Sequence, residues 1–373
     1  MVKRFFKKWH EYCPIYTIAV LILLPFAILL HVLSIMIPTV ADFINRVPAQ
    51  AVRFLLAKST DFLPFSLAEI LFLILIPLAV CGMVISVRLN RKEDPKPARY
   101  YLSSLLAALL TLYILFVLTL GAAYFTTPID KEMDLNKKSI TKEELFETAK
   151  EVRLLAEKEL EQITFQENGS SVMPYDLDTL NKKLNQTYEV MATRYDFISS
   201  LSSHVKPIFL SRALTHTHMS GLYTYMTGEA NINTHFPDSI LPFTMAHEMA
   251  HQRGIAREDE ANFVAFLVTM ESDDPYIRYS GYYEIFKYFV NALYTADQDL
   301  FQEIYADADK RLVGEILAFN EFFKPYEGST AATVTGTIND VYQQIQGVEE
   351  GIQSYGLVVD LTVAYYQKNN SLD

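Results

Sequence analysis

The chain has 373 residues, a formal net charge of −12 and a hydrophobic share of 50%. This length allows one or two domains. The hydrophobic share is high for a soluble protein. The acidic balance argues against nucleic acid as a partner. Both cysteines, Cys13 and Cys81, fall in the amino-terminal third, so the remaining chain has no disulfide and no thiol nucleophile.

Three apolar runs occupy the amino-terminal third, over residues 15–37, 66–87 and 103–124. Each is close to the ~20 residues that cross a bilayer as a helix, and only His31 and Glu69 within them are potentially charged. The first run is too long for the apolar part of a signal peptide, so we expect it to be retained. We therefore predict a multi-pass membrane protein with three transmembrane helices and the lipid bilayer as a partner.

Basic residues predict the orientation of these spans, because positively charged short segments stay in the cytoplasm. They cluster before the first span and between the second and third, at Lys3, Arg4, Lys7, Lys8, Arg88, Arg91, Lys92, Lys96 and Arg99. We expect residues 1–14 to be cytoplasmic and residues 15–125 to form the membrane domain of a plasma-membrane protein. The link 38–65 and the domain 126–373 are then extracytoplasmic.

The link 38–65 combines charged residues with apolar residues at helical spacing. Such a pattern predicts an amphipathic segment that lies on the outer leaflet or against the extracytoplasmic domain. A packed extracytoplasmic hairpin is the alternative.

The domain 126–373 is predicted to be mainly α, with some β structure. Thr141 and Glu144 fit a capping box before a helix, and Gly221–Asn233 is typical of short strands with a turn at Gly228. Residues 228–231 are a candidate edge strand for an extended substrate. Helices are expected over Leu145–Ile163, Leu177–Tyr195, Ala261–Met270, Tyr276–Thr295, Phe301–Phe323 and Ile338–Tyr366.

The most informative motif is His247-Glu248-Met249-Ala250-His251. Histidines four residues apart share one face of a helix and can bind the same divalent ion. Glu248 would lie beside that ion, where it can act as general base toward a water molecule that the ion activates. The motif predicts the chemistry of a zinc peptidase with one Zn²⁺ ion.

A catalytic zinc site needs a third protein ligand, and no histidine follows His251. Gly254 would end the motif helix and let a second helix return a carboxylate to the ion. Glu258 is the expected ligand and Glu260 the alternative. Asn262, one turn after Glu258, would hold a histidine or the ligand in place.

A peptidase must also stabilise the oxyanion that forms on the substrate carbonyl. Tyr223, Tyr225 and His235 lie shortly before the motif and are candidates for this role. Each of them could equally be structural.

Several segments resemble the bacterial family catalogued as domain of unknown function 3810, which is regarded as membrane-bound zinc peptidases. They are Leu241–Ala246, the motif itself, Gln252–Gly254, Glu258–Phe263, Gly228–Asn233, Ser354–Leu361 and the three spans, so the resemblance covers nearly the whole chain. It implies a gluzincin-like metal site in a zincin-like domain, and no particular substrate. Asn262 stands where gluzincins have aspartate, which leaves its role open.

These observations lead to the hypothesis of a membrane-anchored zinc metallopeptidase that cleaves peptides or membrane-proximal proteins. The alternative is a non-catalytic zinc-binding sensor or scaffold in the membrane. Structural zinc sites usually fill all four positions with cysteine or histidine, and the extracytoplasmic domain contains no cysteine. The peptidase is therefore the favoured hypothesis, and the sequence leaves the oligomeric state open.

Overall fold

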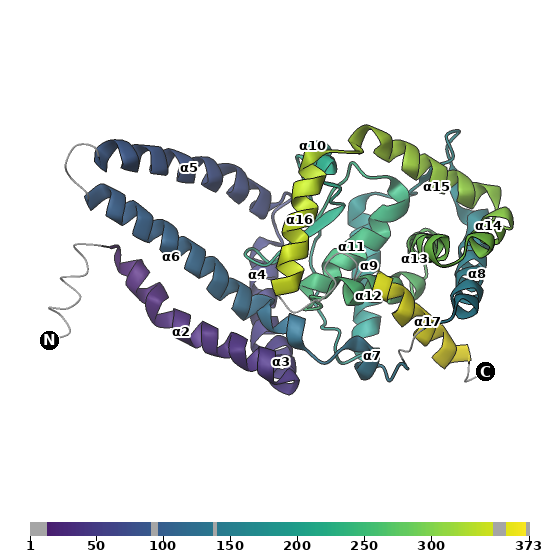
Figure 1. Ribbon diagram of the computed structural model, residues 1–373, viewed down its shortest axis with the longest axis horizontal. Coiled ribbons are helices and arrows are strands. Elements are labelled where there is room, and N and C mark those ends of the chain that lie inside the picture. The colour runs from purple at the N-terminus through teal and green to yellow at the C-terminus, as the bar shows by residue number, and fades with distance from the viewer. Residues whose placement is uncertain (1–12, 91–95, 137–139, 346–355, 371–373) are drawn as a thin grey trace. The chain divides into compact units, whose positions relative to one another are not determined.

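The structure is a computed structural model that describes residues 13–90, 96–136, 140–345 and 356–370 (Figure 1). It is mainly helical. The chain forms two compact units: residues 1–126 with 224–228, and residues 127–223 with 229–373.

Most of the basic residues used to predict the orientation lie outside the described residues. These are Lys3, Arg4, Lys7, Lys8, Arg91 and Lys92. The cytoplasmic placement of residues 1–14 therefore stays a prediction.

The first unit contains three helices that are long and apolar enough to cross a membrane. They are α2 (Ile15–Met36), α5 (Leu67–Asn90) and α6 (Lys96–Thr119), and α6 packs against both of the others (Figure 1). The third candidate span runs over Ala98–Thr119 rather than 103–124. The α-helix stops there because a short 3₁₀ helix, η2 (Gly121–Phe125), begins at a glycine, which has low helix propensity.

The link between the first two spans is helical for most of its length. It consists of α3 (Pro38–Ile44), the π-helical segment η1 (Asn45–Ala49) and α4 (Gln50–Thr60). Arg53 of α4 is buried and donates hydrogen bonds to Asn45 and to the Thr119 carbonyl at the end of α6. Carbonyl groups at a helix end lack partners within the helix. Arg53 supplies a partner for one of them, so this part of the link packs against the end of α6.

The second unit is built mainly from helices. They are α7 (Ile129–Glu132), α8 (Lys142–Glu159), η3 (Leu160–Gln162), α9 (Leu177–Arg194), α10 (Ser211–Leu214), η4 (Thr215–Thr217), η5 (Asp238–Ile240), α11 (Leu241–Gln252), α12 (Glu258–Met270), α13 (Pro275–Ala296), α14 (Gln298–Ala306), α15 (Lys310–Phe323), η6 (Lys324–Tyr326), α16 (Thr330–Ile345) and α17 (Leu357–Asn370). The predicted capping box is confirmed, because Thr141 and Glu144 exchange both hydrogen bonds at the start of α8.

Helix α12 lies in the core of the second unit, where it packs against α9, α11, α13 and α17 (Figure 1). Its residues from Asp259 to Thr269 are all buried, which confirms the predicted core helix. Large side chains such as Phe263, Phe266 and Phe286 are fully enclosed. Burying each contributes about 1.5–3 kcal/mol, so the helix that begins with Glu258 is firmly anchored.

The second unit also contains β strands. The hairpin β1 (Thr164–Phe165) and β2 (Ser171–Val172) is separate from a sheet of β3 (Lys206–Pro207), β5 (Glu229–Ile232) and β4 (Gly221–Thr224), in that order. The predicted turn is confirmed, and Gly228 within it has a φ of 70°. The prediction of an edge strand at residues 228–231 is wrong. Strand β5 lies between β3 and β4, which form the two edges of this sheet.

Two of the long helical predictions also differ from the structure. The pattern over Phe301–Phe323 is divided between α14 and α15, because the Asp309 side chain caps a new helix start by accepting from the Arg311 N–H. The pattern over Ile338–Tyr366 falls on α16 and α17, and residues 346–355 between them lie outside the described residues.

Candidate metal centre

The motif residues lie near the end of α11, and the following turn determines where α12 begins. Gly254 has a φ of 91°, the left-handed conformation that glycine adopts most easily. The Gly254 N–H donates to the His251 carbonyl at 3.0 Å, and the Ile255 N–H donates to the Ala250 carbonyl at 3.1 Å. These two bonds form a Schellman motif. The predicted helix stop is confirmed, and α12 starts four residues later at Glu258.

Three of the predicted ligands come together within the second unit. His247 Nε2 lies 3.2 Å from Glu258 Oε2, and His251 Nε2 lies 3.7 Å from Glu258 Oε1. One ligand atom from each residue lies within 4.8 Å of the others. Among the described residues, this is the one group of three or more His, Cys, Asp or Glu side chains with such spacing.

The orientation of His251 is fixed by the same turn. Its Nδ1 lies 2.7 Å from the Ile255 carbonyl oxygen. A carbonyl can only accept a hydrogen bond, so Nδ1 carries a proton, and Nε2 is the ring nitrogen that faces Glu258. Backbone support of this kind is typical of histidines that ligate metals. His247 Nδ1, by contrast, is buried with no hydrogen-bond partner among the described residues.

The charges of the three side chains stabilise one another. Burial alone would raise the pKa of Glu258, but His251 and His247 hold it well below its usual range. Burial alone would lower the pKa of His251, but Glu258, Glu248 and the Ile255 carbonyl raise it to about 9. The site is therefore negatively charged unless a cation neutralises it, and this cation can be a proton on His251 or a metal ion.

Glu248 lies beside this group and is 5% exposed. Burial raises its pKa, and the two histidines and a backbone hydrogen bond from Tyr223 oppose the shift only in part. Its Oε2 atom is buried with no hydrogen-bond partner among the described residues. A buried carboxylate with a raised pKa and one unused oxygen has the properties of a general base.

Glu260, the alternative ligand, is not part of the group. Its Oε1 accepts a hydrogen bond from the Ile129 N–H at 2.9 Å and pairs with Arg257. These contacts join the start of α12 to the chain that follows the last span. Of the two carboxylates, Glu258 lies with His247 and His251, and Glu260 does not.

Asn262 is buried one turn after Glu258, as expected. Its Nδ2 atom has no hydrogen-bond partner among the described residues, and no hydrogen bond joins it to His247 or His251 there. The structure thus places Asn262 near the ligand without showing the supporting contact that we expected.

The three candidates for oxyanion stabilisation lie in different surroundings. Tyr223 lies on β4 and contacts Glu248 through its backbone. His235 bonds to the Tyr326 hydroxyl at 2.9 Å and packs against aromatic rings of α15 and η6. Tyr225 belongs to the first unit, where its ring packs edge-to-face on Phe116. Of the three, Tyr223 is the one with a contact to Glu248, which lies beside the metal-ligand group.

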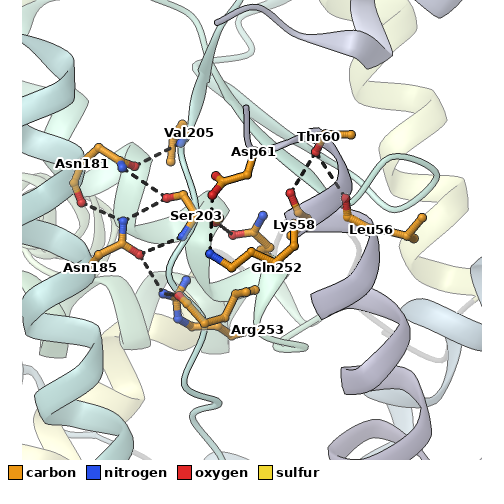
Figure 2. A network of polar contacts seen from close by, with 12 residues as sticks. Leu56, Lys58, Thr60, Asp61, Asn181, Asn185, Ser203, Val205, Gln252 and Arg253 are labelled. Carbon is orange, nitrogen blue, oxygen red and sulfur yellow. Dashed lines mark hydrogen bonds and ion pairs between the residues drawn. The ribbon is translucent and has the colours of Figure 1, made fainter. Parts of the chain in front are cut away.

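A buried polar network holds the end of α11 (Figure 2). Arg253 is 2% exposed, donates to the Met249 and Leu201 carbonyls and to Asn185 Oδ1, and lies over the Tyr188 ring. Burial lowers its pKa to about 10, which leaves the side chain charged at neutral pH. No pattern in the sequence indicates this role, because arginine is seldom fully buried.

The neighbouring Gln252 extends this network. Its Oε1 accepts from the Ser203 hydroxyl at 2.6 Å, and the Ser203 carbonyl accepts from Asn181 and Asn185 of α9 (Figure 2). Gln252 and Arg253, the two residues directly after His251, are thus hydrogen-bonded to α9 or to the loop before β3. The network fixes the helix end that carries the second histidine.

The fold and site together define a mainly helical protein with three candidate membrane-spanning helices and a His-His-Glu group beside a buried glutamate. The family described as "Protein of unknown function (DUF3810)" matches residues 44–363, and the chain belongs to this family. This confirms the resemblance seen in the sequence, while the family description names no activity. No curated protein and no solved structure matches the chain.

Proposed function

We propose that this protein is a membrane-anchored zinc metallopeptidase that hydrolyses peptide bonds. His247, His251 and Glu258 would hold one zinc ion, and Glu248 would act as general base. The observation that carries this proposal is the meeting of three ligand atoms within 4.8 Å beside a buried carboxylate.

The residues present fit a catalytic zinc ion in chemistry and in spacing. Two imidazoles and one carboxylate are a common ligand set for catalytic zinc. Ligands of a tetrahedral zinc lie roughly 3.3 Å apart, given bonds of about 2.0–2.1 Å. The separations of 3.2 Å and 3.7 Å from Glu258 to the two histidines are close to this value.

The number of ligands supports catalysis over a purely structural site. Structural zinc sites are closed by four protein ligands, and catalytic sites keep one position open. The described residues bring three ligands together, and the second unit has no cysteine that could supply a fourth. This argues against the non-catalytic sensor or scaffold.

Each residue then has a defined task. A bound zinc ion would polarise the substrate carbonyl and lower the pKa of a water molecule. Glu248 Oε2 would accept the proton of the attacking water and return it to the leaving amine. The Ile255 carbonyl keeps the proton of His251 on Nδ1, so that Nε2 remains a ligand.

The position of the basic residues in the sequence supports an extracytoplasmic site. The positive clusters before the first span and between the second and third would keep those segments in the cytoplasm. A chain that then crosses the membrane a third time would carry the zincin-like domain to the outside. Peptides and membrane-proximal proteins on that side are the proposed substrates.

The proposal is tested by removing and restoring the metal. Full-length protein in detergent, loaded with one equivalent of zinc, is expected to cleave members of a mixed peptide library. Mass spectrometry should show products with new free carboxyl and amino termini. A chelator should stop the cleavage and added zinc should restore it.

A His247→Ala/His251→Ala variant, purified in the same way, is the control for contaminating peptidases. The proposal fails if zinc-loaded protein produces no more cleavage than this variant. It also fails if cleavage continues unchanged in the presence of the chelator.

A further inference from the structure

Strand β4 passes very close to Glu248 at one position, Gly221. A Cβ atom at Gly221 would lie 2.5 Å from Oε1, 2.6 Å from Cγ and 2.8 Å from Cδ of Glu248. These are the three nearest heavy atoms, and all belong to the same side chain. The φ of Gly221 is outside the positive region, so the backbone itself would accept another residue. The requirement for glycine is therefore one of space.

The strand cannot easily retreat from Glu248, because it is held on both sides of Gly221. The Ser220 carbonyl accepts from the Asn233 N–H at 2.8 Å, and the Leu222 carbonyl accepts from Asn231 Nδ2 at 2.9 Å. Both donors lie on or next to the central strand β5. A side chain added at Gly221 would consequently displace the Glu248 carboxylate rather than the strand.

The same strand also holds the carboxylate in place. The backbone of Tyr223, two residues after Gly221, supplies a hydrogen bond to Glu248. Two residues of β4 thus determine where the Glu248 carboxylate lies. Tyr223 donates a hydrogen bond to it, and Gly221 leaves space for it. Oε2 remains without a partner among the described residues.

We propose that Gly221 is a positioning residue for Glu248, because its missing side chain leaves the space in which the carboxylate is oriented. The part of this inference that concerns catalysis rests on the proposed peptidase function. The part that concerns the placement of Glu248 does not, and it has a test of its own.

The placement is tested by a double-mutant cycle in thermal unfolding of the full-length protein. Gly221→Ala should lower the Tm by roughly 4 °C, because crowding in a packed interior is destabilising. In a Glu248→Ala background the same change should cost roughly 1 °C or less, because the crowded atoms are gone. Gly356→Ala is the matched control, since a Cβ there meets no atom of the described residues within 4 Å. Equal losses in both backgrounds, or no loss in either, would overturn the inference.

The catalytic part is tested with zinc-loaded protein. Gly221→Ala should lower kcat by roughly 100-fold at similar KM, because a base displaced by about 1 Å loses its geometry. Its zinc affinity should stay within about threefold of the wild-type value, because the three atoms nearest the added Cβ all belong to Glu248, which is not a proposed ligand. Wild-type kcat in the variant would overturn the inference. An inactive wild type would instead refute the proposed function, and the unfolding cycle would still decide whether Gly221 places Glu248.

Discussion

Replacing Glu248 by glutamine is expected to lower peptide hydrolysis by about 100- to 10,000-fold, the usual contribution of a general base. Glutamine has nearly the same shape as glutamate but cannot take up a proton from water. Because Glu248 is not one of the three ligands, the zinc content should remain at one ion per chain. The measurements are kcat on a peptide cleaved by the wild type and the zinc content of both proteins.

Glu271→Gln is the matched control for this variant. Glu271 forms a surface ion pair with Arg194, at 2.7 Å, and lies outside the metal-ligand group. Such pairs contribute little to stability, so this control should keep wild-type activity. Glu248 would lose its assigned role if Glu248→Gln cleaved peptides at the wild-type rate.

Glu258→Gln is expected to weaken zinc binding by about 100-fold or more, because even residues that only support ligands contribute 10- to 100-fold. Glu260→Gln makes the same chemical change two residues further along α12. Its glutamine keeps an oxygen that can accept from the Ile129 N–H. We expect this variant to lose less than about tenfold in zinc affinity.

Competition with a chelator of known affinity measures both variants. Strong loss of zinc from Glu260→Gln with little loss from Glu258→Gln would reverse the assignment of the third ligand. Equal, small losses from both would mean that neither carboxylate binds the ion.

The parts of the site that depend on local structure could be predicted from the sequence. The spacing of His247 and His251 places them on one helix face whatever the rest of the fold does. A glycine shortly after the motif predicts the left-handed turn that Gly254 adopts. The three candidate spans could be predicted from composition and length alone. A run of about 20 residues that is apolar on every face can be recognised without knowing any tertiary contact.

The choice between Glu258 and Glu260 could not be made in this way. Both lie in the first turn of the same helix, where acidic residues are favourable in any case. What separates them is the Ile129 N–H and Arg257, which engage Glu260. Ile129 is remote in sequence, and no pattern within the motif indicates that contact.

The same limit applies to residues that support the site from other elements. Gly221 matters for the placement of Glu248 because β4 passes close to that side chain. Arg253 matters for the end of α11 because its side chain bonds to α9 and to the loop that follows α9. Strand order was missed for a related reason. Residues 229–232 have the composition of a strand, but only the pairing of β3 shows that this strand is central.

X-ray absorption on the full-length protein with one equivalent of zinc shows whether His247, His251 and Glu258 bind the ion. We expect a first shell of nitrogen and oxygen atoms at about 2.0–2.1 Å, with the outer-shell scattering of two imidazoles. A shell of sulfur at about 2.3 Å would place the ion on the cysteines instead. That result, or a shell without imidazole, would show that these three residues do not hold the ion.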